Sequence, residues 1–262
     1  MSYIISQWKL ALSVHEYNDD MLSRVRDAGI DMLELSFNEN GYENVLKMYN
    51  DPMWIAEKAS EYDVRLWSLH LPFSGARDIT ANNDADREKT IELNKCLIAA
   101  SAKIGCKVVV IHPSAEPITP DNRPLRLSRS IENLHLLSEY AAEKGIRLAV
   151  ENLPRTCLGH HSDEILTMLE QCPALGVCFD TNHLLIQDNV GFIKAVGENI
   201  ITLHVSDYDF IDERHWLPLE GKNDWKAIIT ALSDVGYDGP WLYESKGTPA
   251  DVADNKRKLE QL

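Results

Sequence analysis

The chain has 262 residues, of which 44% are hydrophobic and 26% are charged, a composition that excludes disorder and provides enough apolar side chains for a large core. Its formal net charge of −15 disfavours nucleic acid and anionic membranes as partners, because such a protein repels phosphate groups. No apolar stretch approaches the ~18–20 residues of a membrane span, and the N-terminus lacks the basic segment of a signal peptide. We therefore expect a cytoplasmic protein.

A repeating unit runs along the chain, made of a helical pattern, a Gly or polar turn and a short apolar run. The apolar runs predict eight strands, at residues 8–14, 30–37, 64–70, 107–112, 146–152, 175–180, 199–207 and 239–245. Helical periodicity fills the segments between them, at residues 18–28, 42–62 with a break near Pro52, 85–105, 127–145, 162–172, 190–198 and 223–236. A last helical stretch follows the eighth strand.

Eight strands alternating with helices predict an α/β fold, a (β/α)8 TIM barrel, as one domain over residues 1–262. Sharing the chain among eight units gives roughly 33 residues each, the size of a βα unit. Most of the strands are continuously apolar, as expected where both faces of a strand are buried. A doubly wound open sheet is the alternative.

The five cysteines are odd in number and show no CxxC pair. Cys96, Cys106 and Cys178 lie inside apolar segments. We expect them to be small buried thiols rather than metal ligands or redox groups.

Side chains that bind divalent metals stand at the ends of six of the eight predicted strands. They are His70, His112, Glu151, Asp180, His204 and Glu244, and His183 follows Asp180 by one turn. Each of them alone is as readily explained by a structural hydrogen bond or a helix cap. Together they predict a metal site, because the carboxyl ends of barrel strands meet at one mouth, where carboxylates and imidazole can hold a cation. Strands one and two end less clearly, with His15 and Glu34 nearby.

Two further features belong to this mouth. Asn152 follows Glu151, and we expect it to orient the ligands through a hydrogen bond. His215 lies in the long polar segment DERHWLPLEGKNDW, which could form a lid. For His215, contact with substrate or metal and a role in loop structure are both open.

The motifs VENLP, CFDTNH, LHVSD and LYES resemble those of the xylose isomerase-like TIM barrels. This superfamily includes sugar isomerases and epimerases, inosose-processing enzymes and AP endonucleases, and the resemblance runs over nearly the whole chain. It implies one divalent metal (Mn²⁺, Mg²⁺, Co²⁺ or Zn²⁺) bound by Glu151, Asp180, His204 and Glu244. It also implies that Glu151 and Glu244 are the catalytic acid/base pair, and that His183 contacts the substrate.

The chain departs from ketose 3-epimerases at two places. Those enzymes carry a glutamate about two turns after the strand-5 ligand, near Cys157 here, and an arginine after the strand-7 histidine, where this chain reads SDYDF. Arg155 and Lys246 lie close to ligand positions and are candidates for binding a phosphate or carboxylate of the substrate. The predicted substrate-binding residues are His70, His112, His183, Arg155, His215 and Lys246.

The hypothesis is a metal-dependent isomerase or epimerase of a small sugar, sugar phosphate or inosose, with no nucleic-acid or membrane partner and with homo-oligomers possible. One alternative is an AP endonuclease-like phosphodiesterase with three zinc ions, where Glu213 replaces that family's aspartate two residues before His215. The net charge of −15 argues against it, because an enzyme acting on DNA needs a basic footprint. A non-catalytic sugar-binding barrel is the other alternative.

Overall fold

The computed structural model describes residues 5–37, 47–48 and 50–262. Its eight strands are β1 (Leu10–Val14), β2 (Met32–Ser36), β3 (Arg65–His70), β4 (Val108–Ile111), β5 (Arg147–Glu151), β6 (Leu175–Asp180), β7 (Ile200–His204) and β8 (Trp241–Tyr243). Strands β1 to β7 pair in parallel in chain order, and β1 pairs with β8. A bridge between Val205 and Tyr243 joins β7 to β8. The predicted TIM barrel is therefore confirmed, and the open doubly wound sheet is wrong.

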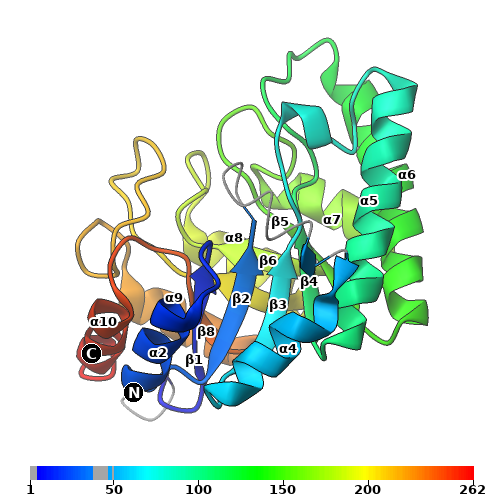
Figure 1. Cartoon of the computed structure of the whole chain (residues 1–262). Helices are drawn as coiled ribbons and strands as arrows, with labels where there is room; N and C mark the ends of the chain where they lie inside the picture. The colour runs from blue at the N-terminus through cyan, green and yellow to red at the C-terminus, as the bar shows by residue number, and fades with distance from the viewer. Residues whose placement is uncertain (1–4, 38–46, 49) are drawn as a thin grey trace.

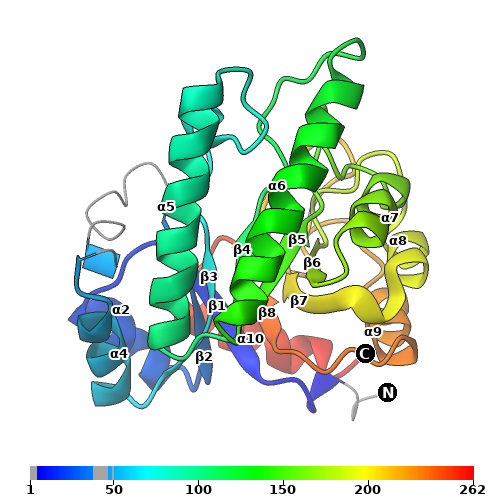
Figure 2. The ribbon, with the colours of Figure 1, turned by 90° about the vertical axis from the view of Figure 1, so that its right-hand side faces the viewer.

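Helices surround the strands, and the loops at the carboxyl ends of the strands gather at one end of the barrel (Figure 1). The helices are α2 (Asp19–Asp27), α4 (Pro52–Glu61), α5 (Asp84–Lys103), α6 (Arg123–Glu143), α7 (Ser162–Gln171), α8 (Asn189–Val196), α9 (Trp225–Asp234) and α10 (Pro249–Leu259). Figure 2 shows the long helices α5 and α6 side by side on one face. A 3-10 turn, η2 (Gly75–Arg77), lies in the loop after β3.

Two predicted helices have different boundaries in the structure. The helix expected over residues 42–62 lies partly outside the described residues, at 42–46 and 49, and α4 begins at Pro52 with Asp51 as its N-cap. Proline fits the first turn of a helix because the N–H it lacks would have no partner there. Helix α6 begins at Arg123, four residues before the predicted start.

Successive side chains along a strand point alternately to the helices outside the barrel and to the barrel interior. A small cluster on the barrel axis is formed by Val108, Val110, Ala149 and Cys178. Glu151 stands two residues after Ala149, so the same alternation turns it toward the axis. Asp180 stands two residues after Cys178 and follows the same rule. On the side of β4, β5 and β6, the barrel interior thus has an apolar cluster with acidic side chains at its carboxyl end.

One expectation about the cysteines is wrong. Cys106 and Cys178 are buried as predicted, but Cys96 is exposed. On α5 the buried positions include Ile91, Asn94 and Leu97, and Cys96 falls on the outer face of the same helix. None of the helices in the described ranges combines the length and apolar character needed to cross a membrane.

Candidate metal centre and substrate pocket

Four side chains from four strands converge on one point at the carboxyl end of the barrel. His204 Nδ1 lies 3.2 Å from Oε1 of Glu151 and 3.2 Å from Oε2 of Glu244. The same nitrogen lies 3.9 Å from Oδ2 of Asp180. Potential ligand atoms of all four residues lie within 4.8 Å of one another. The structure therefore brings together the four residues that the sequence proposes as metal ligands.

Asp180 indicates that the set Glu151, Asp180, His204 and Glu244, called the ring below, suits a cation. Its Oδ1 accepts a hydrogen bond from the Asn182 N–H at 2.5 Å, but its buried Oδ2 has no hydrogen-bond partner among the residues that the structure describes. Burial raises the pKa of Asp180 to about 7, with the charge of Glu151 adding to the effect and that of His183 opposing it. A buried carboxylate oxygen without a donor is costly, and a divalent cation would supply the missing partner.

The other two carboxylates of the ring are held in the ionised form. Burial by itself would raise the pKa of Glu151, but the charges of His204 and His112, with hydrogen bonds from His112 and His183, hold it well below its usual range. Burial also opposes ionisation of Glu244, and the charge and hydrogen bond of His204 outweigh it. Ionised carboxylates are ready both to bind a cation and to accept a proton.

A second group of ligand atoms lies beside the ring. His70 Nε2 lies 3.0 Å from Oε2 of Glu151, and His112 Nε2 lies 3.3 Å from the same oxygen. His70 Nδ1 lies 2.9 Å from the Leu71 carbonyl, which can only accept, so Nδ1 carries a hydrogen. A neutral His70 would then turn the lone pair of Nε2 toward a carboxylate. That contact is favourable only with a proton or a cation between the two atoms.

A third group lies on the other side of the pocket, where His183 has the same arrangement as His70. Its Nδ1 lies 3.0 Å from the Asn152 carbonyl, and its Nε2 lies 3.2 Å from Oε2 of Glu213. His215 points its Nδ1 at the Glu244 carbonyl, at 3.1 Å. His183, Glu213 and His215 form a further set of ligand atoms within 4.8 Å of one another. A hydrogen bond from His183 lowers the pKa of Glu213 to about 2, and Arg155 adds to the shift.

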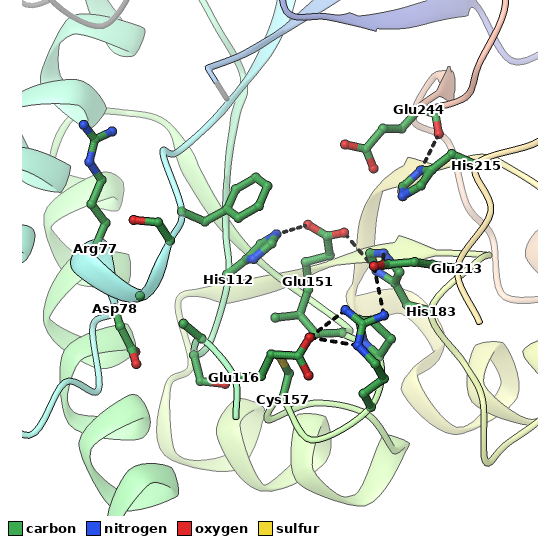
Figure 3. Close-up of a pocket in the computed structure, with 18 residues that line it drawn as sticks. Arg77, Asp78, His112, Glu116, Glu151, Cys157, His183, Glu213, His215 and Glu244 are labelled. Atoms are coloured by element: carbon green, nitrogen blue, oxygen red, sulfur yellow. Dashed lines mark hydrogen bonds and ion pairs between the residues drawn. The ribbon is translucent and has the colours of Figure 1, made fainter. Parts of the chain in front are cut away.

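A cavity of about 340 Å³, a size that suits a small sugar, is lined by six of these residues: His112, Glu151, His183, Glu213, His215 and Glu244. The described residues that line it do not include His70, Asp180 or His204, which lie behind them. In Figure 3, Glu151 lies between His112 and His183, Glu244 and His215 lie on one side, and Arg77 and Asp78 lie on the opposite side. The Phe73 ring stacks on His112 with 4.0 Å between ring centroids and provides an apolar wall. Cys157 also lines the pocket, at the place where ketose 3-epimerases are expected to carry a glutamate.

Arg155 and Lys246 lie in different surroundings. Arg155 lines the pocket, but its guanidinium contacts three carboxylates, at 2.6 Å from Glu116, 2.8 Å from Asp212 and 2.9 Å from Glu213. Its charge is therefore already balanced within the protein. Lys246 is exposed and does not belong to the described residues that line the pocket.

Three residues of this region have only weak signals in the sequence. Glu34 is fully buried on β2 and contacts His204, although the sequence shows it only as an acidic residue near the end of a strand. Phe73 lies three residues after His70, and an aromatic residue in that loop is the only signal the sequence offers. The sequence predicts a role for Glu213 only under the phosphodiesterase alternative.

The chain belongs to the xylose isomerase-like TIM barrel family, whose model matches residues 22–262. It is 27% identical to an L-ribulose 3-epimerase of Methylomonas sp. over 223 residues, covering 78% of this chain and 74% of that protein. It is 24% identical to a ketose 3-epimerase of Arthrobacter globiformis over 250 residues, covering 91% and 81%. A crystal structure of a D-tagatose 3-epimerase-like protein has the same fold, with a TM-score of 0.83 at 23% identity, covering 97% of this chain and 96% of that one.

Proposed function

We propose that this protein is a divalent-metal-dependent epimerase or isomerase that moves a proton at a carbon next to the carbonyl of a small sugar, sugar phosphate or inosose. The observation that carries the proposal is the convergence of Glu151, Asp180, His204 and Glu244 beside a cavity of sugar size. Relatives named L-ribulose 3-epimerase and ketose 3-epimerase support the same class of reaction.

The four residues of the ring would hold one divalent cation. Such a cation supplies positive charge that polarises a substrate carbonyl and makes the neighbouring C–H more acidic. The donor set is three carboxylates and one imidazole, which suits Mn²⁺, Mg²⁺, Co²⁺ or Zn²⁺. Oδ2 of Asp180 is buried and has no hydrogen-bond partner in the described part of the chain, and this supports the need for a cation most directly.

Glu151 and Glu244 would act as the acid/base pair. Both line the pocket, and both approach His204 Nδ1 at 3.2 Å, so their carboxylates flank the same point. One ionised carboxylate takes the proton from the carbon, and the other, when protonated, delivers a proton to the opposite face or to the adjacent atom. His70 and His112 contact Oε2 of Glu151, which fixes the orientation of the carboxylate and turns Oε1 toward the ring.

The test is solvent-deuterium exchange into a panel of ketoses, inososes and their phosphates, combined with metal analysis of the purified protein. We expect about one divalent metal per chain, and we expect Glu151→Gln and Glu244→Gln to slow exchange by at least about 100-fold, the usual contribution of a positioned acid or base. Glu139→Gln is the control, because Glu139 is exposed on α6 and does not belong to the described residues that line the pocket. Exchange retained by both ring variants would contradict the assignment.

A second candidate is a phosphodiesterase with several metal ions, and three of the sets of ligand atoms in the described residues favour it. The sets are Glu151, Asp180, His204 and Glu244; His70, His112 and Glu151; and His183, Glu213 and His215. Such a protein would bind about three zinc ions and nick abasic duplex DNA, with metals activating water and stabilising the leaving oxygen. One metal per chain and no nicking would remove this candidate. A barrel that binds sugars without turnover would show sugar binding but no deuterium exchange.

A further inference from the structure

We infer that Glu34 is a positioning residue for the metal centre, which selects the tautomer of His204 and turns its Nδ1 toward the metal. The inference rests on the metal site of the proposed function. Glu34 is fully buried on β2, and His204 ends β7. These two strands are not neighbours in the sheet, so the contact between the two side chains crosses the interior of the barrel.

The hydrogen bonds of Glu34 leave one arrangement for the imidazole. Oε2 of Glu34 accepts a hydrogen bond from the Ser68 hydroxyl at 2.7 Å, and Oε1 lies 2.9 Å from His204 Nε2. A carboxylate can only accept, so Nε2 must carry a hydrogen. Without metal, Nδ1 also faces carboxylates and carries a hydrogen, so the imidazole is charged. When a cation replaces that hydrogen, Glu34 keeps the other one on Nε2, and the lone pair of Nδ1 is left to face the cation.

A role limited to folding does not explain a fourth carboxylate at this place. Glu151, Asp180 and Glu244 already surround the same imidazole. A further buried acid adds repulsion and a desolvation cost, which an apolar residue of similar size would avoid. A carboxylate behind a metal-binding histidine has a direct benefit, because it fixes the ring and makes the ligand nitrogen more basic. The sequence agrees, since Glu34 stands between Leu33 and Leu35 in an otherwise apolar strand.

Glu34→Gln tests the inference with the smallest change of shape. The Ser68 hydroxyl can donate to the amide oxygen, which leaves the amide N–H group facing His204 Nε2. That contact favours the tautomer with hydrogen on Nδ1, which cannot bind a metal. We expect the Mn²⁺ affinity, measured by titration calorimetry on the full chain, to fall by about 10–100-fold, the usual effect of removing such a partner. In the Mg²⁺-loaded protein, ¹⁵N NMR of the histidines should show hydrogen on Nε2 of His204 in the wild type.

Two controls separate positioning from general disturbance of the interior. Ser68→Ala removes one hydrogen bond of Glu34 but keeps the carboxylate, so its loss of Mn²⁺ affinity should be smaller than that of Glu34→Gln. Thr202→Val changes a buried residue of β7 whose hydroxyl accepts a hydrogen bond from the Trp67 indole. It leaves the contacts of His204 intact, so any loss of melting temperature should come without a loss of Mn²⁺ affinity.

A folded Glu34→Gln protein that binds Mn²⁺ with wild-type affinity would overturn the inference. Should this variant not fold, Glu34→Asp decides in the same way, because it keeps the charge but draws the carboxylate away from His204. Loss of affinity in that variant supports positioning, and wild-type affinity overturns it. Failure of the wild type to bind Mn²⁺ would instead overturn the metal site itself. Mn²⁺ binding without sugar turnover would contradict only the proposed reaction.

Discussion

The side chain of Asn152 is paired with both backbone groups of Asp180. Its Nδ2 donates to the Asp180 carbonyl at 2.9 Å, and its Oδ1 accepts from the Asp180 N–H at 2.8 Å. The backbone carbonyl of Asn152 also faces His183 Nδ1 at 3.0 Å. One residue thus ties the end of β5 to the end of β6 and fixes the backbone that carries a predicted metal ligand. These hydrogen bonds are the contacts through which Asn152 would orient Asp180.

Asn152→Ala should lower both the stability and the metal affinity of the protein. The substitution leaves a buried N–H and a buried carbonyl without partners, at a cost of about 1–3 kcal/mol each, and it frees the backbone at Asp180. Thermal unfolding and Mn²⁺ titration measure the two effects. Asn255→Ala is the matched control, because Asn255 is also buried with two hydrogen bonds, to Tyr243 and Pro218. It should destabilise the fold without weakening Mn²⁺ binding, and equal losses of affinity in both variants would contradict the role of Asn152.

The barrel and the convergence of the proposed ligands could be predicted from the sequence for a topological reason. In a parallel barrel all strands end at the same mouth, so polar residues that close apolar runs, such as Glu151 and Asp180, must meet. Nothing more than strand order is needed for that inference. The same reasoning cannot find Glu34, because its partner His204 lies across the barrel and the contact depends on the register of two strands that do not pair.

Loop residues were predicted less well than strand ends. Arg155 follows a ligand strand closely, so its position near the pocket could be predicted. Its partners could not, because Glu116 comes from the loop after β4, and Asp212 and Glu213 come from the loop after β7. Those loops have no periodic pattern from which their paths could be predicted, and only the folded structure places three acids around one guanidinium.

Metal-free protein should lose stability as the pH rises from about 4 to about 7 because of Asp180, so it should be less stable at pH 8 than at pH 6. Burial raises its pKa from 3.8 to about 7, so the folded state favours the neutral carboxyl. The resulting stability is fully present below the unfolded pKa and is lost as the pH rises through about 7. Asp180→Asn should weaken this dependence, while the raised pKa values of His183 and His204 leave part of it. The variant should melt at a higher temperature than the wild type at pH 8 with EDTA.

Addition of Mn²⁺ should reverse that order at pH 8. The cation needs the ionised carboxylate, so it should raise the melting temperature of the wild type more at pH 8 than at pH 6. The Asn variant should gain little at either pH. Equal melting temperatures of the metal-free wild type at both pH values, together with an Asn variant that is no more stable, would contradict this account of Asp180.

Arg155→Ala should change the pocket more than the stability. The side chain of Arg155 is about a third exposed, and exposed ion pairs contribute only about 0–1 kcal/mol each. Without Arg155, Glu116 in the loop after β4 is no longer linked to Asp212 and Glu213 in the loop after β7. Hydrogen exchange should therefore become faster in residues 209–216. The KM for the sugar should rise severalfold with little change in kcat.

Arg214→Ala is the control for Arg155. Arg214 has the same exposed fraction, 36%, but among the described residues the ion pair of its side chain is with Asp209 of the same loop. Its backbone N–H donates to Asn182, a contact that the substitution keeps. It should leave hydrogen exchange near Arg155 and the KM close to wild type. A rise in KM confined to phosphorylated substrates would instead assign Arg155 to phosphate binding.

Gly221→Ala should disrupt the loop that carries Glu213 and His215. Asp207 organises this loop by accepting hydrogen bonds from the backbone N–H groups of Tyr208, Leu219, Gly221 and Asn223 and from the Trp225 indole. A methyl group on residue 221 would collide with the Asp207 carboxylate and with the Tyr208 carbonyl. Overpacking of this kind costs about 1–3 kcal/mol, which a thermal melt detects, and displacement of His215 should also slow deuterium exchange into the sugar.

Gly75→Ala separates this effect from a general cost of losing a glycine. Gly75 belongs to η2 on the wall of the same pocket, and a methyl group there would meet nothing within 4 Å. The variant should melt like the wild type, or slightly higher, since alanine restricts the unfolded chain. A Gly221→Ala protein that is as stable as Gly75→Ala would show that the hydrogen bonds of Asp207 tolerate displacement and do not fix the loop.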